Sequence, residues 1–546
     1  MLRPFALLAL CSAALLGACV GEISTPGSGD DAPGGGSTAT QSALNEVGVS
    51  GARRLTAAEY DATVMDLLGI ADPNSETALP EDLRSPFDND YQKQLASEAL
   101  INSADSLAAK LADQVTASTT LREKLVPCTP NAASDGVCFE KFLRSFGRRA
   151  LRRPLTDEDV TRFMTLLDHG TSAGDFWVAV NSALRAFLQH PELLYRIELG
   201  SAVSGKPGLF RLNDFEIATR LSYLLWGSTP PDSLLDAAAS GKLSTASGVR
   251  AAAKDLLDDD RAKARVSRFH SMWLGYEKLP HSPELSADMQ TETNALLDRV
   301  IFEHDSPWLD LLRSKETFLT PSLAEHYGLP APAGNKPGWV SYGSSGRQGL
   351  LSQGSFLSAV AKFDDTSPTQ RGLLIRTRLF CMEIHKPPPE LKVNSDEPPA
   401  GPDPDACKAD RYVMWKTDGC SSCHSLMDPV GFGLENYDSS GRYRDHEPDR
   451  PDCPIDGEGF VEGVGTFKGP AELSDRLIET GELESCVAKQ YLRFSLGRYA
   501  LDEHDANLLS RLVAVAEQSG ELSFETLMLE LTGSESFRYR REEPTP

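Results

Sequence analysis

The stretch Leu55-Thr56-Ala57-Ala58-Glu59-Tyr60 is a complete signal for the start of a helix. Thr56 is placed as the N-cap, Glu59 closes a capping box with it, and Leu55 and Tyr60 are placed as a hydrophobic staple. Apolar residues continue at helical spacing until Gly69, a residue type that commonly ends a helix. The stretch therefore predicts a helix that begins after Thr56 and stops at Gly69.

The same start signal recurs twice further along the chain. Leu155-Thr156 is followed by Asp159, and Leu212-Asn213 is followed by Glu216. No convincing series of alternating strands accompanies these signals. The chain has 546 residues, which is long enough for several domains. We therefore predict a mainly α protein built from several consecutive helical modules.

The composition is that of a globular protein with an acidic surface. Hydrophobic residues make up 40% of the chain and charged residues 24%, both ordinary values. The net charge is −25 at pH 7. Such a charge would repel phosphates, so the chain is not expected to bind nucleic acid.

The N-terminus has the features of a secretory signal. Arg3 precedes an apolar run from Phe5 to Leu16, which is shorter than the roughly 20 residues needed to span a bilayer. The run ends at Leu16-Gly17-Ala18-Cys19, which resembles a bacterial lipobox. We predict a signal peptide over residues 1–18 and lipid on Cys19. An ordinary signal peptide without lipid is the alternative.

Residues 19–49 are expected to form a lipidated flexible tether, because glycine, serine and proline dominate them. Val20 follows the predicted lipidation site, so the usual Asp signal for retention at the inner membrane is missing. No other stretch is long and apolar enough to span a membrane. We expect an exported lipoprotein of the cell envelope, at the outer membrane, that is held by its lipid anchor only.

A second decisive motif lies near the C-terminus, at Cys420-Ser421-Ser422-Cys423-His424. Two thiols three positions apart, followed at once by an imidazole, form the attachment signature of c-type haem. The thiols can bond the two vinyl groups, and His424 is then aimed at the iron as proximal ligand. We predict one covalent haem c. One alternative is a Cys420–Cys423 disulfide with His424 at the surface, and another is a zinc half-site, although no second Cys or His pair has zinc spacing.

The distal side of the predicted haem has several candidates. Met414 lies six residues before Cys420, and a methionine ligand would raise the reduction potential. His446 is a rival ligand, and an open distal position is a third alternative. In a further alternative, Met414 does not bind the iron and is a core residue beside Trp415.

Other residues near the motif are expected to surround the porphyrin. Arg442 and Arg444 either bind its propionates or belong to a solvated turn. Asp428-Pro429 is expected to shape a turn. The predicted walls are Phe432, Leu434 and Tyr437.

The remaining cysteines suggest disulfides, since an exported chain meets an oxidising compartment. Cys128 and Cys138 flank a short loop rich in turn formers and are the safest pair. Four more cysteines remain, and their connectivity stays open. Cys381–Cys486 with Cys407–Cys453 is one pairing of these four.

The chain resembles the large secreted proteins built from the planctomycete cytochrome-C-like domains of unknown function (the series 1587, 1595, 1592, 1588 and 1585). After C-x-x-C-H, the hallmark elements are Asp428-Pro429-Val430-Gly431-Phe432, Glu435-Asn436-Tyr437-Asp438, Gly441 and Arg442. Further matching motifs are Arg54-Leu55-Thr56, Arg152-Arg153-Pro154-Leu155-Thr156, Leu221-Ser222-Tyr223-Leu224-Leu225-Trp226 and Ser367-Pro368…Arg371-Gly372. The resemblance implies an exported haem protein, and it implies that the place of Met414 commonly holds a histidine.

These observations divide the rest of the chain into predicted segments. They are an N-terminal helical domain (50–120), a disulfide-opened helical domain (121–204), a large helical domain (205–384), a Pro-rich linker (385–410), a small cytochrome-c-like haem segment (411–468) and a C-terminal helical domain (469–546).

The predicted function is transfer of single electrons between extracytoplasmic redox partners. One alternative is a haem-dependent oxidoreductase, because the segment 205–384 is larger than a carrier requires. The other is an extracellular binding module in which the haem is minor.

Overall fold

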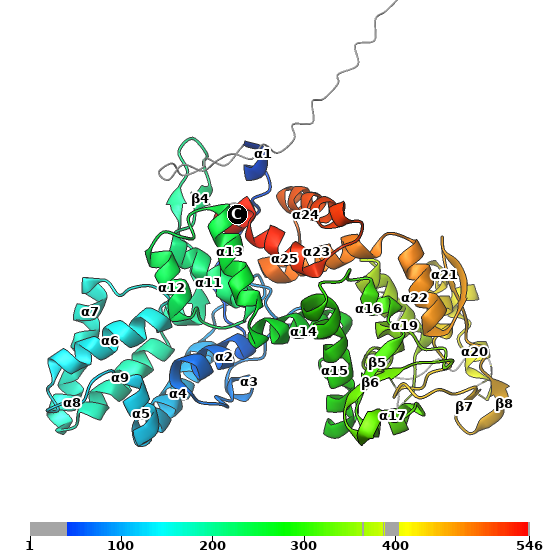
Figure 1. Ribbon diagram of the computed structural model, residues 1–546, viewed down its shortest axis with the longest axis horizontal. Helices are drawn as coiled ribbons and strands as arrows, with labels where there is room; N and C mark the ends of the chain where they lie inside the picture. The colour runs from blue at the N-terminus through cyan, green and yellow to red at the C-terminus, as the bar shows by residue number, and fades with distance from the viewer. Residues whose placement is uncertain (1–40, 363–364, 386, 388–402, 404, 544–546) are drawn as a thin grey trace, which may run out of the picture. The chain divides into compact units, whose positions relative to one another are not determined.

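The computed structural model describes residues 41–362, 365–385, 387, 403 and 405–543 (Figure 1). The fold is mainly α, as predicted, and its strands are short (Figure 1). The predicted signal peptide, Cys19 and most of the tether lie outside the described residues, as does most of the linker 385–410. Among the described residues, no helix combines the length and the apolar character that crossing a membrane requires.

The three predicted helix starts are confirmed, with capping boxes closed in both directions. Helix α2 (Ala57–Leu68) begins after Thr56, whose side chain accepts from the Glu59 amide at 3.2 Å. Helices α7 (Asp157–Met164) and α11 (Asp214–Leu225) begin in the same way after Thr156 and Asn213. Gly69 ends α2 with φ +73°, a left-handed conformation that favours glycine. Local sequence chemistry therefore determines where these helices begin.

A first core packs the helices between residues 55 and 194. Its side chains include Phe142, Phe146, Phe163 and Phe187, and the rings of Phe163 and Phe187 stack at 4.1 Å. The larger helices are α4 (Glu98–Ala117), α6 (Gly136–Ala150) and α9 (Phe176–Leu188). Shorter ones are α3 (Ser75–Ala78), α5 (Thr119–Leu125), α8 (Leu167–Ala173) and α10 (Pro191–Leu194).

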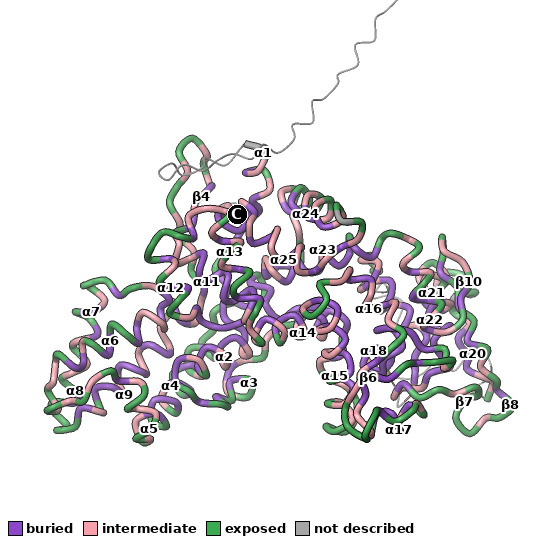
Figure 2. The backbone as a smooth tube through the Cα atoms, viewed as in Figure 1, coloured by how far each residue is buried: buried purple, intermediate pink, exposed green. Residues whose placement is uncertain are grey.

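A second, larger core gathers residues that are far apart in the chain. Figure 2 shows the buried residues along the backbone in purple. The ring of Phe269 packs against those of Phe87, Trp273, Phe494 and Phe524. The predicted segments 50–120, 205–384, 411–468 and 469–546 all contribute buried residues to this core. Their predicted boundaries stay predictions.

Most of the remaining helices follow one another in two stretches of chain. The first comprises α12 (Asp232–Ala239), α13 (Ala246–Leu257), α14 (Asp260–Leu274), α15 (Pro283–Leu297), η1 (Asp298–Glu303), α16 (Asp310–Arg313), α17 (Pro321–Tyr327), η2 (Ala333–Asn335), η3 (Leu350–Ser352) and α18 (Gly354–Ser358). The second comprises α22 (Gly469–Glu479), α23 (Leu483–Leu496), α24 (Glu503–Ala516), η6 (Glu517–Ser519), α25 (Phe524–Thr532) and α26 (Glu535–Arg538). Helix α1 (Gln41–Leu44) precedes them all.

The strands form small antiparallel sheets, some of which join segments that are distant in the chain. Strand β11 (Tyr539–Arg541) pairs with β4 (Leu209–Arg211), which also pairs with β3 (Ser201–Ala202). The two-stranded pairs are β1 (Arg53–Arg54) with β2 (Tyr195–Arg196), β5 (Glu316–Leu319) with β6 (Gly338–Ser341), β7 (His446–Glu447) with β8 (Arg450–Pro454), and β9 (Glu458–Val461) with β10 (Gly465–Lys468).

Three disulfides cross-link the chain. The predicted Cys128–Cys138 bond is confirmed, and it closes the short loop before α6. The open connectivity is resolved as Cys381–Cys486 and Cys407–Cys453, which join residues 105 and 46 positions apart. The second of these bonds anchors the segment before the C-x-x-C-H motif to strand β8.

Helix α21 (Ser421–Phe432), which carries the motif, crosses α19 (Pro368–Leu374) at very short range. A Cβ on Gly372 would lie 2.5 Å from the carbonyl carbon of Met427, and one on Gly431 would lie 2.6 Å from Cα of Pro368. Both glycines are therefore required for this crossing. The segments beside it are η4 (Ile375–Leu379), α20 (Lys408–Arg411) and η5 (Met414–Lys416).

Candidate functional site

The C-x-x-C-H motif occupies the first turn of α21. Cys420 immediately precedes the helix, and Cys423 lies one turn further on. The two side chains therefore lie next to each other on one face of the helix. Both are free thiols and both are partly exposed. The structure therefore has no disulfide between Cys420 and Cys423, and that alternative is wrong.

The imidazole of His424 is held through one of its two nitrogens. Nδ1 lies 3.0 Å and 3.1 Å from the two carboxylate oxygens of Asp428, one helical turn further on. Because a carboxylate accepts, Nδ1 carries the hydrogen. The hydroxyl of Thr369 on α19 donates to the same carboxylate at 2.7 Å. Among the described residues, Nε2 of His424 has no hydrogen-bond partner, and the side chain is 29% exposed.

Asp428 is thus a site residue that the sequence reasoning missed. Asp428-Pro429 was expected to shape a turn, but both residues lie inside α21, and the side chain of Asp428 is fully buried. The missed signal is the spacing of His424 and Asp428, because residues four apart face each other on a helix.

The two distal-ligand candidates lie on different elements. Met414 is in η5, which packs against α21, and it is 39% exposed. The alternative of a buried core methionine is therefore wrong. His446 is exposed on β7, and its Nδ1 lies 2.9 Å from the Asp445 carboxylate.

The two arginines have different surroundings. The side chain of Arg442 is exposed, and its backbone amide donates to Asp438 at 2.9 Å. Arg444 contacts Glu435 at 3.0 Å and Asp365 at 3.2 Å. Arg444 therefore already has carboxylate partners within the protein, which favours a structural role for its charge.

Glu435 is the centre of a buried ion-pair cluster. It is 3% exposed and contacts Arg371 at 3.2 Å, Lys408 at 3.1 Å and Arg444. Asp365 joins the cluster through Lys408 at 2.6 Å. Burial alone would raise the pKa of Asp365, but Lys408 and Arg444 outweigh it and lower that pKa to about 2. The cluster ties α19, α20 and the segment after α21 together.

The three predicted wall residues separate in the structure. Leu434 and Tyr437 are buried in the larger core, where the guanidinium of Arg347 lies over the Tyr437 ring at 4.7 Å. Phe432 is half-buried, with its ring edge-on to Tyr412 at 6.0 Å.

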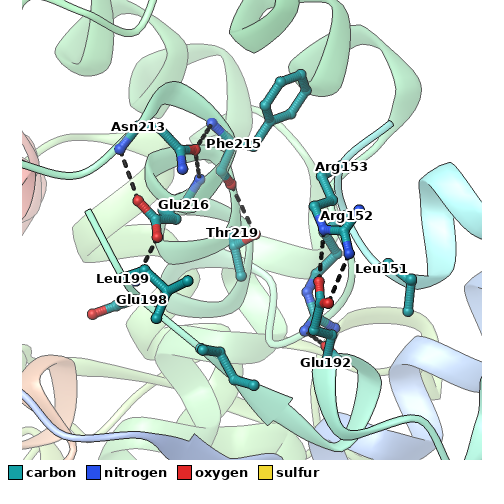
Figure 3. A pocket seen from close by; sticks show the side chains of 11 residues that line it. Leu151, Arg152, Arg153, Glu192, Glu198, Leu199, Asn213, Phe215, Glu216 and Thr219 are labelled. Atoms are coloured by element: carbon teal, nitrogen blue, oxygen red, sulfur yellow. Dashed lines mark hydrogen bonds and ion pairs between the residues drawn. The ribbon is translucent and has the colours of Figure 1, made fainter. Parts of the chain in front are cut away.

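A separate pocket of about 400 Å³ opens beside the N-terminal end of α11 (Figure 3). Arg153 forms two hydrogen bonds of 2.7 Å with Glu192 there, and Glu216 accepts from the backbone amides of Asn213 and Leu199. These carboxylates are thus satisfied inside the protein. The sequence did not predict this pocket, because its lining residues come from separate stretches of chain. Arg153, Asn213 and Glu216 were noted only as parts of a family motif and of a helix start.

Fold and site together define a mainly α protein with a C-x-x-C-H motif at the start of a helix. Five family models match consecutive segments, each described as a protein of unknown function. They are DUF1587 at residues 53–117, DUF1595 at 138–198, DUF1592 at 212–329, DUF1588 at 347–447 and DUF1585 at 465–537. The chain belongs to the family built from this series of planctomycete cytochrome-C-like domains. Comparisons with curated proteins and with solved structures found no match.

Proposed function

We propose that this protein is an exported, lipid-anchored carrier of single electrons with one covalent haem c. The observation that carries the proposal is the first turn of α21. There, two free thiols lie beside the imidazole of His424. One imidazole nitrogen is held by a buried carboxylate, and the other has no hydrogen-bond partner within the part of the chain that the structure describes. Ligating histidines characteristically have this arrangement, with the second nitrogen bonded to a carboxylate or carbonyl.

The donor set fits haem c. Cys420 and Cys423 would hold the porphyrin through thioethers, and Nε2 of His424 would bind the iron. Bound haem supplies a one-electron Fe(III)/Fe(II) couple. The chain's own residues orient this ligand, because Asp428 fixes the imidazole ring through Nδ1. Met414 is our preferred sixth ligand, because it is accessible on η5, the segment next to the motif.

The proposed location is the cell envelope outside the cytoplasm, with the lipid anchor in the outer membrane. Three disulfides agree with an oxidising compartment. The partners we expect are extracytoplasmic redox proteins, and the membrane would be contacted through lipid on Cys19 only. Mass spectrometry of the N-terminal peptide of the mature protein tests the anchor: acylated Cys19 is expected, and an unmodified Cys19 thiol contradicts it.

The haem itself is tested by a pyridine haemochrome assay and visible spectra of protein matured in a host that attaches haem c. We expect one covalent haem per chain. The double variant Cys420→Ser/Cys423→Ser should be colourless, while the matched Ser422→Ala variant keeps the haem. A wild-type protein without a Soret band refutes the proposal.

The axial ligands are tested on the same material. A six-coordinate, low-spin spectrum that CO and cyanide leave unchanged is expected of a carrier. Met414→Leu should open the sixth position and allow CO to bind. If His446→Ala does so instead, the distal ligand is His446.

A second candidate is a haem-dependent oxidoreductase, because the segment 205–384 is larger than a carrier requires. The pocket beside α11 has the volume of a small-molecule site, but Figure 1 shows α11 far from α21, so this pocket by itself does not support catalysis at the iron. An enzyme of this kind predicts that CO or cyanide binds the iron of the unmodified protein.

A further inference from the structure

We propose that Asp428, fixed by Thr369, is a positioning residue that strengthens His424 as an iron ligand and lowers the reduction potential of the haem. This inference rests on the proposed function. Its basis is a three-residue chain from α19 to the imidazole, in which Thr369 donates to Asp428 at 2.7 Å and His424 Nδ1 donates at 3.0 Å.

The carboxylate is placed where its charge acts on the imidazole. Asp428 is fully buried, so water does not screen its interaction with the ring. Among the described residues, no lysine or arginine forms an ion pair with it. Thr369 and His424 are its hydrogen-bond partners there. The negative charge is therefore directed at the Nδ1–H bond.

This charge has a definite effect on the iron. A carboxylate that accepts from Nδ1–H raises the electron density and the basicity of the imidazole. A more basic imidazole stabilises Fe(III) more than Fe(II), because the ferric ion carries the larger charge. The arrangement therefore favours the oxidised state and lowers the potential.

The crossing of α19 and α21 holds the hydrogen-bonded residues Thr369, Asp428 and His424 rigidly. Thr369 follows Pro368, whose backbone lies directly against Gly431 of α21. Arg376 of η4, the segment that follows α19, also donates from Nε to the carbonyl oxygen of Leu426 at 2.9 Å and so joins η4 to α21. Backbone contacts between these elements therefore fix the position from which the Thr369 hydroxyl reaches Asp428.

The experiment compares midpoint potentials of the haem-loaded full chain. Asp428→Asn keeps the shape and a hydrogen-bond acceptor but removes the charge. We expect the Fe(III)/Fe(II) equilibrium to move roughly tenfold toward Fe(II), a rise of about 59 mV for a one-electron couple. The control is Asp418→Asn, which removes the same charge from an exposed residue close to the motif. Its shift should be much smaller.

A second pair of variants tests the role of Thr369 without touching the carboxylate. Thr369→Val removes the hydroxyl that fixes Asp428, so the carboxylate is held less firmly against Nδ1 of His424, and the potential should rise above that of the wild type, toward that of Asp428→Asn. Thr369→Ser keeps the hydroxyl and should restore the wild-type value. Should Asp428→Asn fail to retain haem, this pair alone decides the matter.

The outcomes separate the inference from the function on which it rests. A wild-type protein without haem overturns the proposed function. A haem-loaded protein in which Asp428→Asn and Asp418→Asn shift the potential equally overturns the inference alone. So does a Thr369→Val variant with the same potential as Thr369→Ser.

Discussion

The crossing of α19 and α21 makes a sharp prediction about Gly372. In Gly372→Ala, the new Cβ would lie 2.5 Å from the carbonyl carbon and 2.9 Å from Cα of Met427, and contacts under 3.0 Å are essentially never seen. These are backbone atoms, which cannot rotate away. The two helices would have to separate by roughly 1 Å, which weakens the packing between them.

The expected cost follows from two opposing effects. Overpacking a well-packed contact costs about 1–3 kcal/mol, and a clash with rigid backbone belongs at the upper end. Replacing glycine by alanine inside a helix returns about 1 kcal/mol. The free energy of opening the crossing should therefore fall by about 2 kcal/mol, which corresponds to roughly 30-fold more frequent opening.

Hydrogen–deuterium exchange of peptides covering 368–374 and 421–432 measures this opening directly. The matched control is Gly136→Ala in α6, where a Cβ would meet Leu167 Cδ2 and Met164 Cε at an ordinary 3.6 Å. That variant should be neutral or slightly stabilising, with no effect on α19 or α21. Unchanged exchange in both peptides of Gly372→Ala would refute the reasoning about the crossing.

Two further predictions concern buried charges. Glu292 accepts from Thr317 at 2.6 Å and from Tyr327 at 2.8 Å, and burial raises its pKa from 4.5 to about 7. Because the pKa of Glu292 is higher in the folded than in the unfolded protein, the free energy of unfolding should rise by roughly 3 kcal/mol as pH falls from 7 to 4.5. Glu292→Gln should remove this part of the pH dependence, which urea unfolding at pH 8 and pH 5 measures. An identical pH dependence in the wild type and in Glu292→Gln would contradict the prediction. Glu435→Gln should destabilise the protein by about 3–5 kcal/mol, because it leaves buried cations without their counter-charge. The urea midpoint measures this loss, and the exposed Glu458→Gln, which should leave the midpoint unchanged, is the control.

The amino-acid sequence by itself determined the features that depend on residues a few positions apart. Thr56 and Glu59 form their capping box within the first turn of the helix, so the start of α2 was predictable. The Cys128–Cys138 bond likewise joins residues only 10 positions apart. The C-x-x-C-H motif is a run of five consecutive residues and can be read directly from the sequence. In each case the hydrogen bond or covalent bond is formed within one local segment, and the residue types specify it.

Tertiary packing decided what depends on residues far apart in the chain. Cys381 meets Cys486 across 105 positions, and no local signal distinguishes this pairing from its alternatives. Leu434 and Tyr437 follow the C-x-x-C-H motif in sequence, yet they fill the larger core because helices from other segments surround them. The link from Thr369 to Asp428 exists only because two glycines let α19 and α21 approach until their backbones touch. Contacts of this kind are set by the packing of whole helices, and the local sequence carries no record of which helix will be the neighbour.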